Sequence, residues 1–164
     1  MAGAIAPRMS RAIAGCSWSA PEGHPKSTQE EGRALNSLPE NVRVLIDGPN
    51  YAHIATVLPD GAPHSVPVWV GLEGDRIAFL TSPNSRKARN LAREPRVAIS
   101  ITDRENPHMM AQIRGRVTER VECDGAWTII DRISNKYIGQ PYPLRTDRVV
   151  FLIRPEQAWG MAFS

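Results

Sequence analysis

The spacing of apolar side chains along the chain changes from helical to alternating near Tyr51. Residues 38–46 place Leu, Val and Ile at helical intervals, which predicts a short helix that residues 37–40 open as a capping box and Asp47-Gly48 ends. From Tyr51 onward the period is two, so strands are predicted at residues 51–58, 63–70 and 76–81. Turn residues separate these strands at Pro59-Asp60-Gly61-Ala62 and at Glu73-Gly74-Asp75.

The second half of the chain predicts two more helices and three more strands. One helix opens at Ser82-Pro83 and must stop before Pro95, because proline disfavours helix at the residue before it. The other helix has Asp124 as its cap, ends at Gly139, and carries on one face Trp127, Ile130, Ile133 and Tyr137 or Ile138. The strands are predicted at residues 96–102, at 108–121 with a bulge at Gly115, and at 148–153 before a short tail over 157–164. Six strands joined mainly by hairpins predict a mainly β fold with flanking helices, in the form of an antiparallel barrel.

Composition separates residues 1–34 from the rest of the chain. This segment is rich in Ala, Gly, Ser and Pro without sustained periodicity, which predicts a flexible N-terminal extension before one domain over residues 35–164. It lacks the continuous apolar stretch of a signal peptide, and no apolar run in the sequence approaches the ~20 residues that cross a bilayer. We therefore expect a cytoplasmic protein without a membrane partner.

The segment from Thr81 to Leu91 carries the most informative chemistry. It joins the end of a strand to the start of a helix, where free backbone N–H groups and the helix dipole favour an anion. Ser82 and Ser85 can cap the helix or donate to phosphate oxygens, and Lys87 supplies a positive charge. Because cations oppose the dipole at this end of a helix, a bound anion best explains the presence of Arg86 and Lys87.

The basic residues near this segment allow more than one interpretation. Between Arg86 and Arg96 the chain has five cations and one acid, Glu94, within a net charge of +3. Such an excess suits either an anionic ligand or a solvated helix face. Asn90 is either a contact of that ligand or a surface residue. No nucleic-acid partner is expected, because the basic residues are not interleaved with aromatic ones.

Other catalytic devices are missing from the sequence. The residues His53, His64 and His108 lack the spacing of metal ligands, so no metal site is predicted. The sequence contains neither a nucleophile elbow nor a glycine-rich nucleotide loop. Enzymatic chemistry would therefore belong to a bound cofactor, and no catalytic residue is assigned. Candidate proton donors are His53, His108, Tyr137 and Tyr142.

Three stretches of the chain resemble one known superfamily: HIATVLPDGAPHSVPVWV, RIAFLTSPNSRKARNLAREPRVAISI and IRGRV. The second contains the pattern S-x-K-x-x-N-L-x-x-x-P-R-V, from Ser85 to Val97. Over about residues 53–161 the chain resembles the pyridoxamine-phosphate-oxidase-like split-barrel superfamily. The closer similarity is to the actinobacterial branch that uses the 5-deazaflavin coenzyme F420 in place of FMN. This resemblance implies an FMN-binding-like, six-stranded split β-barrel, and a homodimer with cofactor sites at the subunit interface.

The resemblance also implies roles for individual residues. Lys87 would bind the cofactor phosphate, with the help of Ser85, Arg86 and Asn90. The return strand would run under the tricyclic ring with Ser65, Val66, Pro67, Val68 and Trp69. That position also accounts for Pro67, because its missing N–H requires a sheet edge, a bulge or a ligand in place of a neighbouring strand. Thr81 and Ser82 would lie beside the phosphate and the ribityl chain. The partner subunit would contribute His108, Met109 and Met110, and residues 159–161 would lie near the interface.

The activity implied by the resemblance is hydride transfer between F420 and a small organic acceptor. The same fold holding FMN and a non-catalytic carrier of the cofactor are the alternatives. Pyridoxamine phosphate oxidases hold their substrate with an Arg-containing C-terminal segment, which has no counterpart in the sequence up to Ser164. Pyridoxamine phosphate is therefore not the expected substrate.

Overall fold

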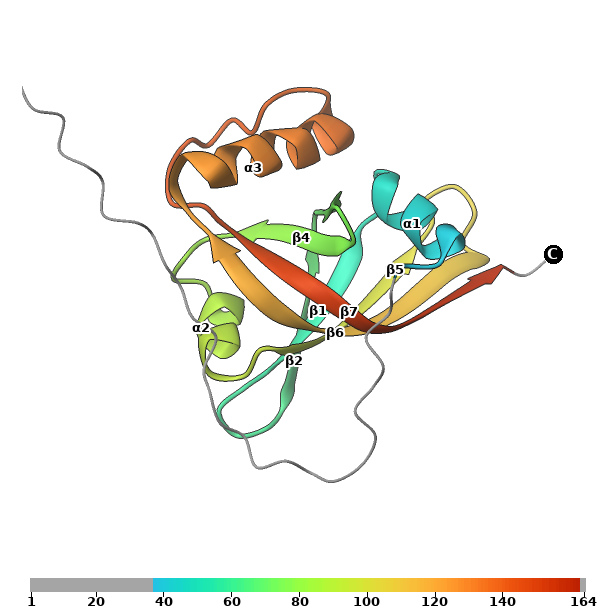
Figure 1. Cartoon of the computed structure of the whole chain (residues 1–164), viewed down its shortest axis with the longest axis horizontal. Helices are drawn as coiled ribbons and strands as arrows, with labels where there is room; N and C mark the ends of the chain where they lie inside the picture. Colours follow the sequence, from blue (N-terminus) through green and yellow to red (C-terminus); the bar gives the residue numbers. More distant parts are fainter. Residues whose placement is uncertain (1–36, 163–164) are drawn as a thin grey trace, which may run out of the picture.

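Seven strands and three helices make up the described part of the chain, residues 37–162 of a computed structural model (Figure 1). The predicted extension over residues 1–34 lies outside the described residues. The helices are α1 (Glu40–Asp47), α2 (Arg86–Arg93) and α3 (Cys123–Ile138). The strands are β1 (Ala52–Val57), β2 (Pro63–Val68), β3 (Val70–Glu73), β4 (Arg76–Thr81), β5 (Arg96–Thr102), β6 (Met109–Val121) and β7 (Val149–Ala162). All pairings are antiparallel, in one sheet of order β2-β1-β5-β6-β7-β4-β3.

Trp69 alone separates β2 from β3, although these strands lie at opposite ends of the sheet. The chain bends at this residue, so that the segment 63–73 joins the two edges of a sheet that curls on itself (Figure 1). The predicted antiparallel split barrel is confirmed. The strand predicted over residues 63–70 is divided by the bend, which raises the number of strands in residues 37–162 from six to seven. Pro67 lies in the edge strand β2, as its missing N–H requires.

Apolar side chains on the inner face of the sheet fill the barrel. Ile54, Ile99 and Ile113 lie side by side on β1, β5 and β6 and are fully or almost fully buried. Farther along the sheet, Phe79 of β4 stacks on Phe151 of β7 with ring centroids 5.5 Å apart. This alternation of buried and outward-facing residues is the origin of the period of two in the sequence.

The helices cover parts of the sheet that would otherwise expose apolar surface. Helix α1 buries Val42, Leu45 and Ile46 in the barrel interior. Helix α3 buries Ile130 and Ile133 against a second apolar cluster on the other face of β4 and β7 (Figure 1). None of the helices within residues 37–162 is long and apolar enough to span a bilayer.

Two helix starts differ from the prediction. Pro39 is the N-cap of α1, and no side chain of the described residues caps this helix, so the predicted capping box at residues 37–40 is wrong. Helix α3 begins at Cys123, so Asp124 lies in its first turn and is not the cap. Its predicted end is confirmed, because Gly139 adopts the left-handed conformation with a φ of 71°.

Strands β6 and β7 pair over almost their full lengths. The register shifts at Gly115, which confirms the predicted bulge, and a Cβ added there would lie 2.5 Å from the carbonyl oxygen of Arg154. Strand β7 continues to Ala162, so the predicted tail over residues 157–164 is wrong over its described part. Pro155 is accommodated within the strand because it lies opposite Gly115 at the register shift, where the ladder is already interrupted.

Candidate functional site

Two hydroxyl groups fix the start of α2 to the end of β4. The Ser85 hydroxyl caps the helix by accepting a hydrogen bond of 3.2 Å from the Ala88 backbone N–H. Thr81, the last residue of β4, donates its hydroxyl to the same oxygen at 3.0 Å. Because that oxygen accepts two hydrogens, the Ser85 O–H proton remains available to a ligand. The helix opening predicted at Ser82-Pro83 is therefore wrong, since α2 begins at Arg86 after this cap.

Buried residues hold the opposite side of α2 against the barrel. Ala88 and Leu91 belong to the interior cluster. Asn90 is 2% exposed, and its side-chain amide donates to the Thr56 hydroxyl of β1 at 3.0 Å. Asn90 is therefore not a surface residue, and the bond to Thr56 anchors the helix on the sheet. This anchoring sets the position of every other side chain of α2.

Lys87 lies in the first turn of α2 and is half-buried. Within residues 37–162, neither a carboxylate nor a hydrogen-bond acceptor contacts its ammonium group. Burial lowers the pKa of Lys87, because loss of hydration disfavours the charged form. The first turn of α2 also contains no acidic residue among those described. The conflict between this cation and the helix dipole is thus not relieved by any group of the described residues.

The other cations of α2 are placed differently. Arg89 donates to the carbonyl of Asn84 at 2.5 Å, and Arg93 donates to the carbonyl of Val57 at 2.5 Å. Their guanidinium groups therefore support the backbone at the two ends of the helix. Arg86 is exposed beside Lys87. At the start of the helix the basic excess thus provides Arg89, which is engaged by the Asn84 carbonyl, together with Arg86 and Lys87.

Lys87 lines a cleft with a volume of about 260 Å³. The cleft is lined by Tyr51, Pro67, Val68, Trp69, Leu80, Lys87 and Tyr142. The return strand and the start of α2 therefore meet in one cleft. An aromatic wall beside a half-buried cation suits a flat ring that carries an anionic group.

Contacts with Tyr137 and Tyr142 hold Trp69, part of the aromatic wall of the cleft, in place. The Trp69 ring stacks on Tyr137 with centroids 4.9 Å apart and an interplanar angle of 4°, and it meets Tyr142 edge-on at 6.1 Å. The Tyr137 hydroxyl donates to the Asn50 carbonyl at 2.6 Å and accepts from the Val70 N–H at 3.2 Å. Burial raises the pKa of Tyr137 to about 12. Its proton is committed to the backbone, so this residue positions Trp69 and is a poor proton donor.

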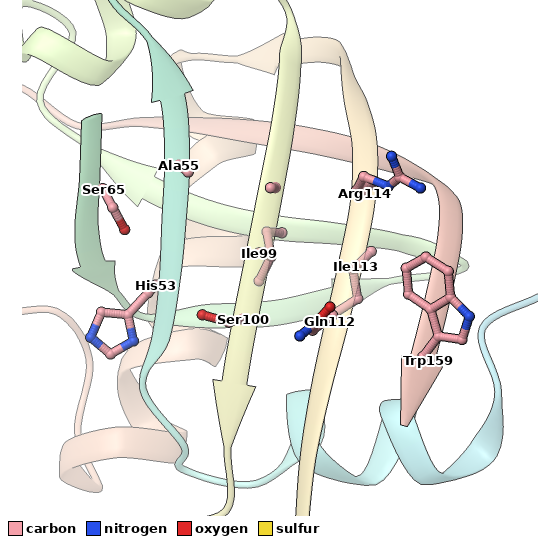
Figure 2. A pocket seen from close by; sticks show the side chains of 10 residues that line it. His53, Ala55, Ser65, Ile99, Ser100, Gln112, Ile113, Arg114 and Trp159 are labelled. Atoms are coloured by element: carbon pink, nitrogen blue, oxygen red, sulfur yellow. The ribbon is translucent and has the colours of Figure 1, made fainter. Parts of the chain in front are cut away.

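A second hollow, of about 380 Å³, lies on the outer face of the sheet (Figure 2). Its lining consists of His53, Ala55, Ser65, Ala98, Ile99, Ser100, Gln112, Ile113, Arg114 and Trp159. The Trp159 side chain is 51% exposed, and the Arg114 guanidinium lies 5.6 Å from its ring centroid. Ser65 and Pro67 share the outer face of β2, so the hollow and the cleft border the same strand.

The remaining predicted site residues lie outside the cleft. Val66 points inward and packs against the barrel interior, and Ser82 lies in the loop before the α2 cap. His108, Met109 and Met110 lie at the β5–β6 turn and the start of β6, at the end of the molecule opposite α2 (Figure 1). One chain therefore does not bring these three residues to Lys87.

Three cleft residues were not predicted as binding residues. They are Tyr51, Leu80 and Tyr142, of which Tyr142 had been singled out only as a candidate proton donor. Their places depend on the bend at Trp69 and on the course of the loop 139–148, which local spacing does not encode. Within the described part of the chain, no three His, Cys, Asp or Glu side chains are grouped so that they could hold a metal ion.

Comparison with known proteins identifies relatives of the chain. A profile of the family described as pyridoxamine 5'-phosphate oxidase matches residues 38–162. A solved structure named F420 Reductase is 30% identical with a TM-score of 0.65, and the match covers 74% of this chain and 98% of that one. No curated protein matches the sequence.

Two further solved structures share the fold at lower identity. A conserved hypothetical protein from Mycobacterium tuberculosis is 23% identical with a TM-score of 0.62, over 82% of this chain and 90% of that one. The heme storage protein HutZ from Vibrio cholerae is 21% identical with a TM-score of 0.60, over 78% and 97% of the two chains. The same barrel therefore carries different functions in different proteins.

Proposed function

Because the chain belongs to the pyridoxamine 5'-phosphate oxidase family, we propose that it is an oxidoreductase that binds the deazaflavin coenzyme F420 beside Lys87 and transfers a hydride between this coenzyme and a small organic acceptor. The observation that carries the proposal is the half-buried Lys87 ammonium, which has no counter-ion within residues 37–162. A phosphate at the start of α2 would satisfy both this cation and the helix dipole. The 30% identity to a protein named F420 Reductase favours F420 over FMN.

The chemical types of the residues at the cleft suit such a ligand. Lys87 and the Ser85 hydroxyl would hold the phosphate, with Arg86 at the rim. Trp69 and Tyr142 would pack against the ring system, and the open edge of β2 would offer it backbone groups. When bound, the coenzyme supplies the hydride chemistry. The chain's own residues then have to bind and orient the reactants and exclude water between them.

Tyr142 is the candidate proton donor whose position best supports this role. Its side chain lines the cleft, and its hydroxyl oxygen accepts a hydrogen bond of 3.2 Å from Arg148, which leaves its own proton free to move to an acceptor. His53 lines the neighbouring hollow, whereas the Tyr137 proton is committed to the Asn50 carbonyl. His108 is exposed far from α2.

A cleft of about 260 Å³ is smaller than most ligand pockets, which span roughly 300–1,000 Å³. We infer that a second copy of the chain covers the outer face of the sheet and completes the site. Trp159, 51% exposed, and Met161, 39% exposed, would form the apolar part of that interface. The partner would then bring its residues 108–110 to the cofactor, which accounts for their distance from Lys87 in one chain.

The substitution Trp159→Glu is expected to dissociate this homodimer, because it places a charge in the apolar part of the interface. Light scattering should give twice the 18.1 kDa of one chain for the wild type and about 18 kDa for the variant. Circular dichroism of the variant should remain that of a folded barrel, since the side chain is half exposed in the single chain. A wild type that is monomeric at every concentration would contradict the dimer.

Cofactor affinity is expected to fall with rising pH earlier than an ordinary lysine would require. Burial lowers the pKa of Lys87, so its ammonium loses the charge that binds phosphate at a lower pH than an exposed lysine. In Lys87→Arg the charge persists to a pH of about 12, so this variant should keep its affinity where the wild type loses it. Fluorescence titrations with F420 between pH 6 and pH 10 measure the difference. Identical pH profiles of the two proteins would show that Lys87 is not the group that binds the phosphate.

The proposed function is tested by titrating the purified protein with F420 and with FMN. Tight binding of F420, followed by oxidation of its reduced form by electron-poor acceptors in single-turnover mixing, is the expected result. Binding of FMN but not of F420 would identify an FMN-dependent protein of the same fold. Binding of F420 without hydride transfer to any acceptor would identify a carrier, and binding of neither cofactor would reject the proposal.

A further inference from the structure

The loop between α3 and β7, residues 139–148, forms one wall of the Lys87 cleft. Tyr142 is its cleft-lining residue, and three contacts hold it in place. The backbone N–H of Tyr142 donates to Asp131 at 3.0 Å, and its ring meets Trp69 edge-on at 6.1 Å. Its hydroxyl accepts the third contact, a hydrogen bond of 3.2 Å from Nε of Arg148. These contacts fix the position of Tyr142, and they bring a second cation, Arg148, next to the cleft.

Arg148 lacks a counter-ion in the part of the chain that the structure describes. Apart from Tyr142, its only hydrogen-bond partner there is the backbone carbonyl of Asp147, at 2.8 Å from Nη1. Its guanidinium carbon lies 5.4 Å from the centroid of the Tyr142 ring. By contrast, Arg145 of the same loop is paired with Asp131 at 2.5 Å. Arg148 is half-buried and positively charged, and it retains N–H groups for an external acceptor.

The sheet register places Arg148 at the same strand end as Lys87. Val149 pairs with Thr81, the last residue of β4, so Arg148 lies at the level of Ser82, where the chain leaves the sheet for the α2 cap. Tyr142 connects the two cations, because its ring lines the cleft with Lys87 and its hydroxyl contacts Arg148. Lys87 thus lines the cleft, and Arg148 adjoins it through Tyr142; within residues 37–162 neither cation has a counter-ion.

We propose that Arg148 is the cation of a second anion-binding subsite, adjoining that of Lys87, and that it selects ligands with a second anionic group beyond the phosphate. This inference rests on the proposed function and extends it to cofactor specificity. FMN ends in a single phosphate, whereas F420 carries a chain of carboxylates beyond its phosphate. A guanidinium binds carboxylate and phosphate oxygens through paired N–H donors, so both groups suit this subsite.

The test compares F420 and FMN affinities of the wild type, Arg148→Gln and Lys87→Ala. Arg148→Gln is expected to weaken F420 binding by about tenfold, the loss of one charge-assisted contact, and to change FMN binding less than twofold. Lys87→Ala should weaken both. Arg154→Gln removes the charge of an exposed arginine on β7 and serves as the matched control, with no change expected for either cofactor.

A separate variant distinguishes ligand binding from support of Tyr142. Tyr142→Phe removes the hydroxyl that Arg148 contacts but keeps the ring against Trp69, and F420 affinity should change less than threefold. If Tyr142→Phe loses as much F420 affinity as Arg148→Gln, then Arg148 only props the ring and the inference is wrong. If Arg148→Gln weakens the binding of F420 and of FMN equally, Arg148 does not select for a second anionic group, and the inference is also wrong.

Inorganic anions test the subsite independently of either cofactor. Calorimetry should show that the wild type binds pyrophosphate, with two anionic groups, at least fivefold more tightly than phosphate, and that Arg148→Gln loses this preference. Equal preference in the two proteins would overturn the inference. Unchanged F420 affinity in Arg148→Gln together with weaker binding in Lys87→Ala would refute the subsite alone. Unchanged affinity in Lys87→Ala would refute the proposed function instead.

Discussion

Lys87→Ala is expected to weaken F420 binding by about 10- to 150-fold, which corresponds to the ~1.5–3 kcal/mol of a hydrogen bond to a charged group. The effect is large because the ammonium is half-buried, so the phosphate meets a cation that water screens poorly. The variant should fold as well as the wild type or slightly better. Removing Lys87 also removes a partly desolvated charge that has no partner among the described residues.

Fluorescence titration gives the affinity and a thermal melt gives the stability. Arg93→Ala is the matched control, because it removes a cation from the far end of the same helix, where the guanidinium contacts the Val57 carbonyl. F420 affinity of that variant should stay within about threefold of the wild type, as for other exposed charges. An equal loss in both variants would mean that the overall charge of α2 attracts the ligand and that Lys87 has no special contact.

Leu91→Ala is expected to lower the free energy of unfolding by about 2–5 kcal/mol, the usual cost of emptying a buried leucine site. Leu91 is fully buried and is one of the two apolar side chains that dock α2 on the barrel, Ala88 being the other. Urea denaturation measures the loss. The exposed neighbour Ala92 gives the control, since Ala92→Ser should change the stability by about 0.5 kcal/mol or less. A loss below 1 kcal/mol in Leu91→Ala would show that α2 is not held by its apolar face.

The elements of the fold followed from local patterns wherever one physical signal dominated. Strand β5 has the same bounds in the prediction and in the structure, because its alternation of apolar and polar residues is uninterrupted and Pro95 marks its start. Gly115 identified the bulge, and the structure gives the physical reason, because a Cβ at this position would have no room beside the Arg154 carbonyl. Arg86 and Lys87 drew attention to this part of the chain because cations oppose the dipole at the start of a helix. In the structure both lie in the first turn of α2, and Lys87 lines the cleft.

The errors arose where distant pairing overrides local sequence. The last part of β7 contains a proline and a glycine and reads as a tail, but β6 supplies a partner along its whole length. The bend at Trp69 has no local signal in the sequence. It arises because residues 63–73 form strands at both edges of the sheet, β2 and β3. Tyr51 precedes β1, and Tyr142 lies in the loop between α3 and β7. Only the three-dimensional fold brings these two residues to the cleft, so their roles are not visible in the sequence.

The position of β7 between β6 and β4 bears on how the protein is made in the cell. The hairpins β1–β2 and β3–β4 are complete early in synthesis, but their apolar faces stay uncovered until residues 149–162 have left the ribosome and been inserted between β6 and β4. Nascent chains that lack this strand should therefore be held by chaperones or degraded. Translation pauses between the codons of β6 and those of β7 would lengthen that vulnerable interval, whereas pauses before β1 would have little effect.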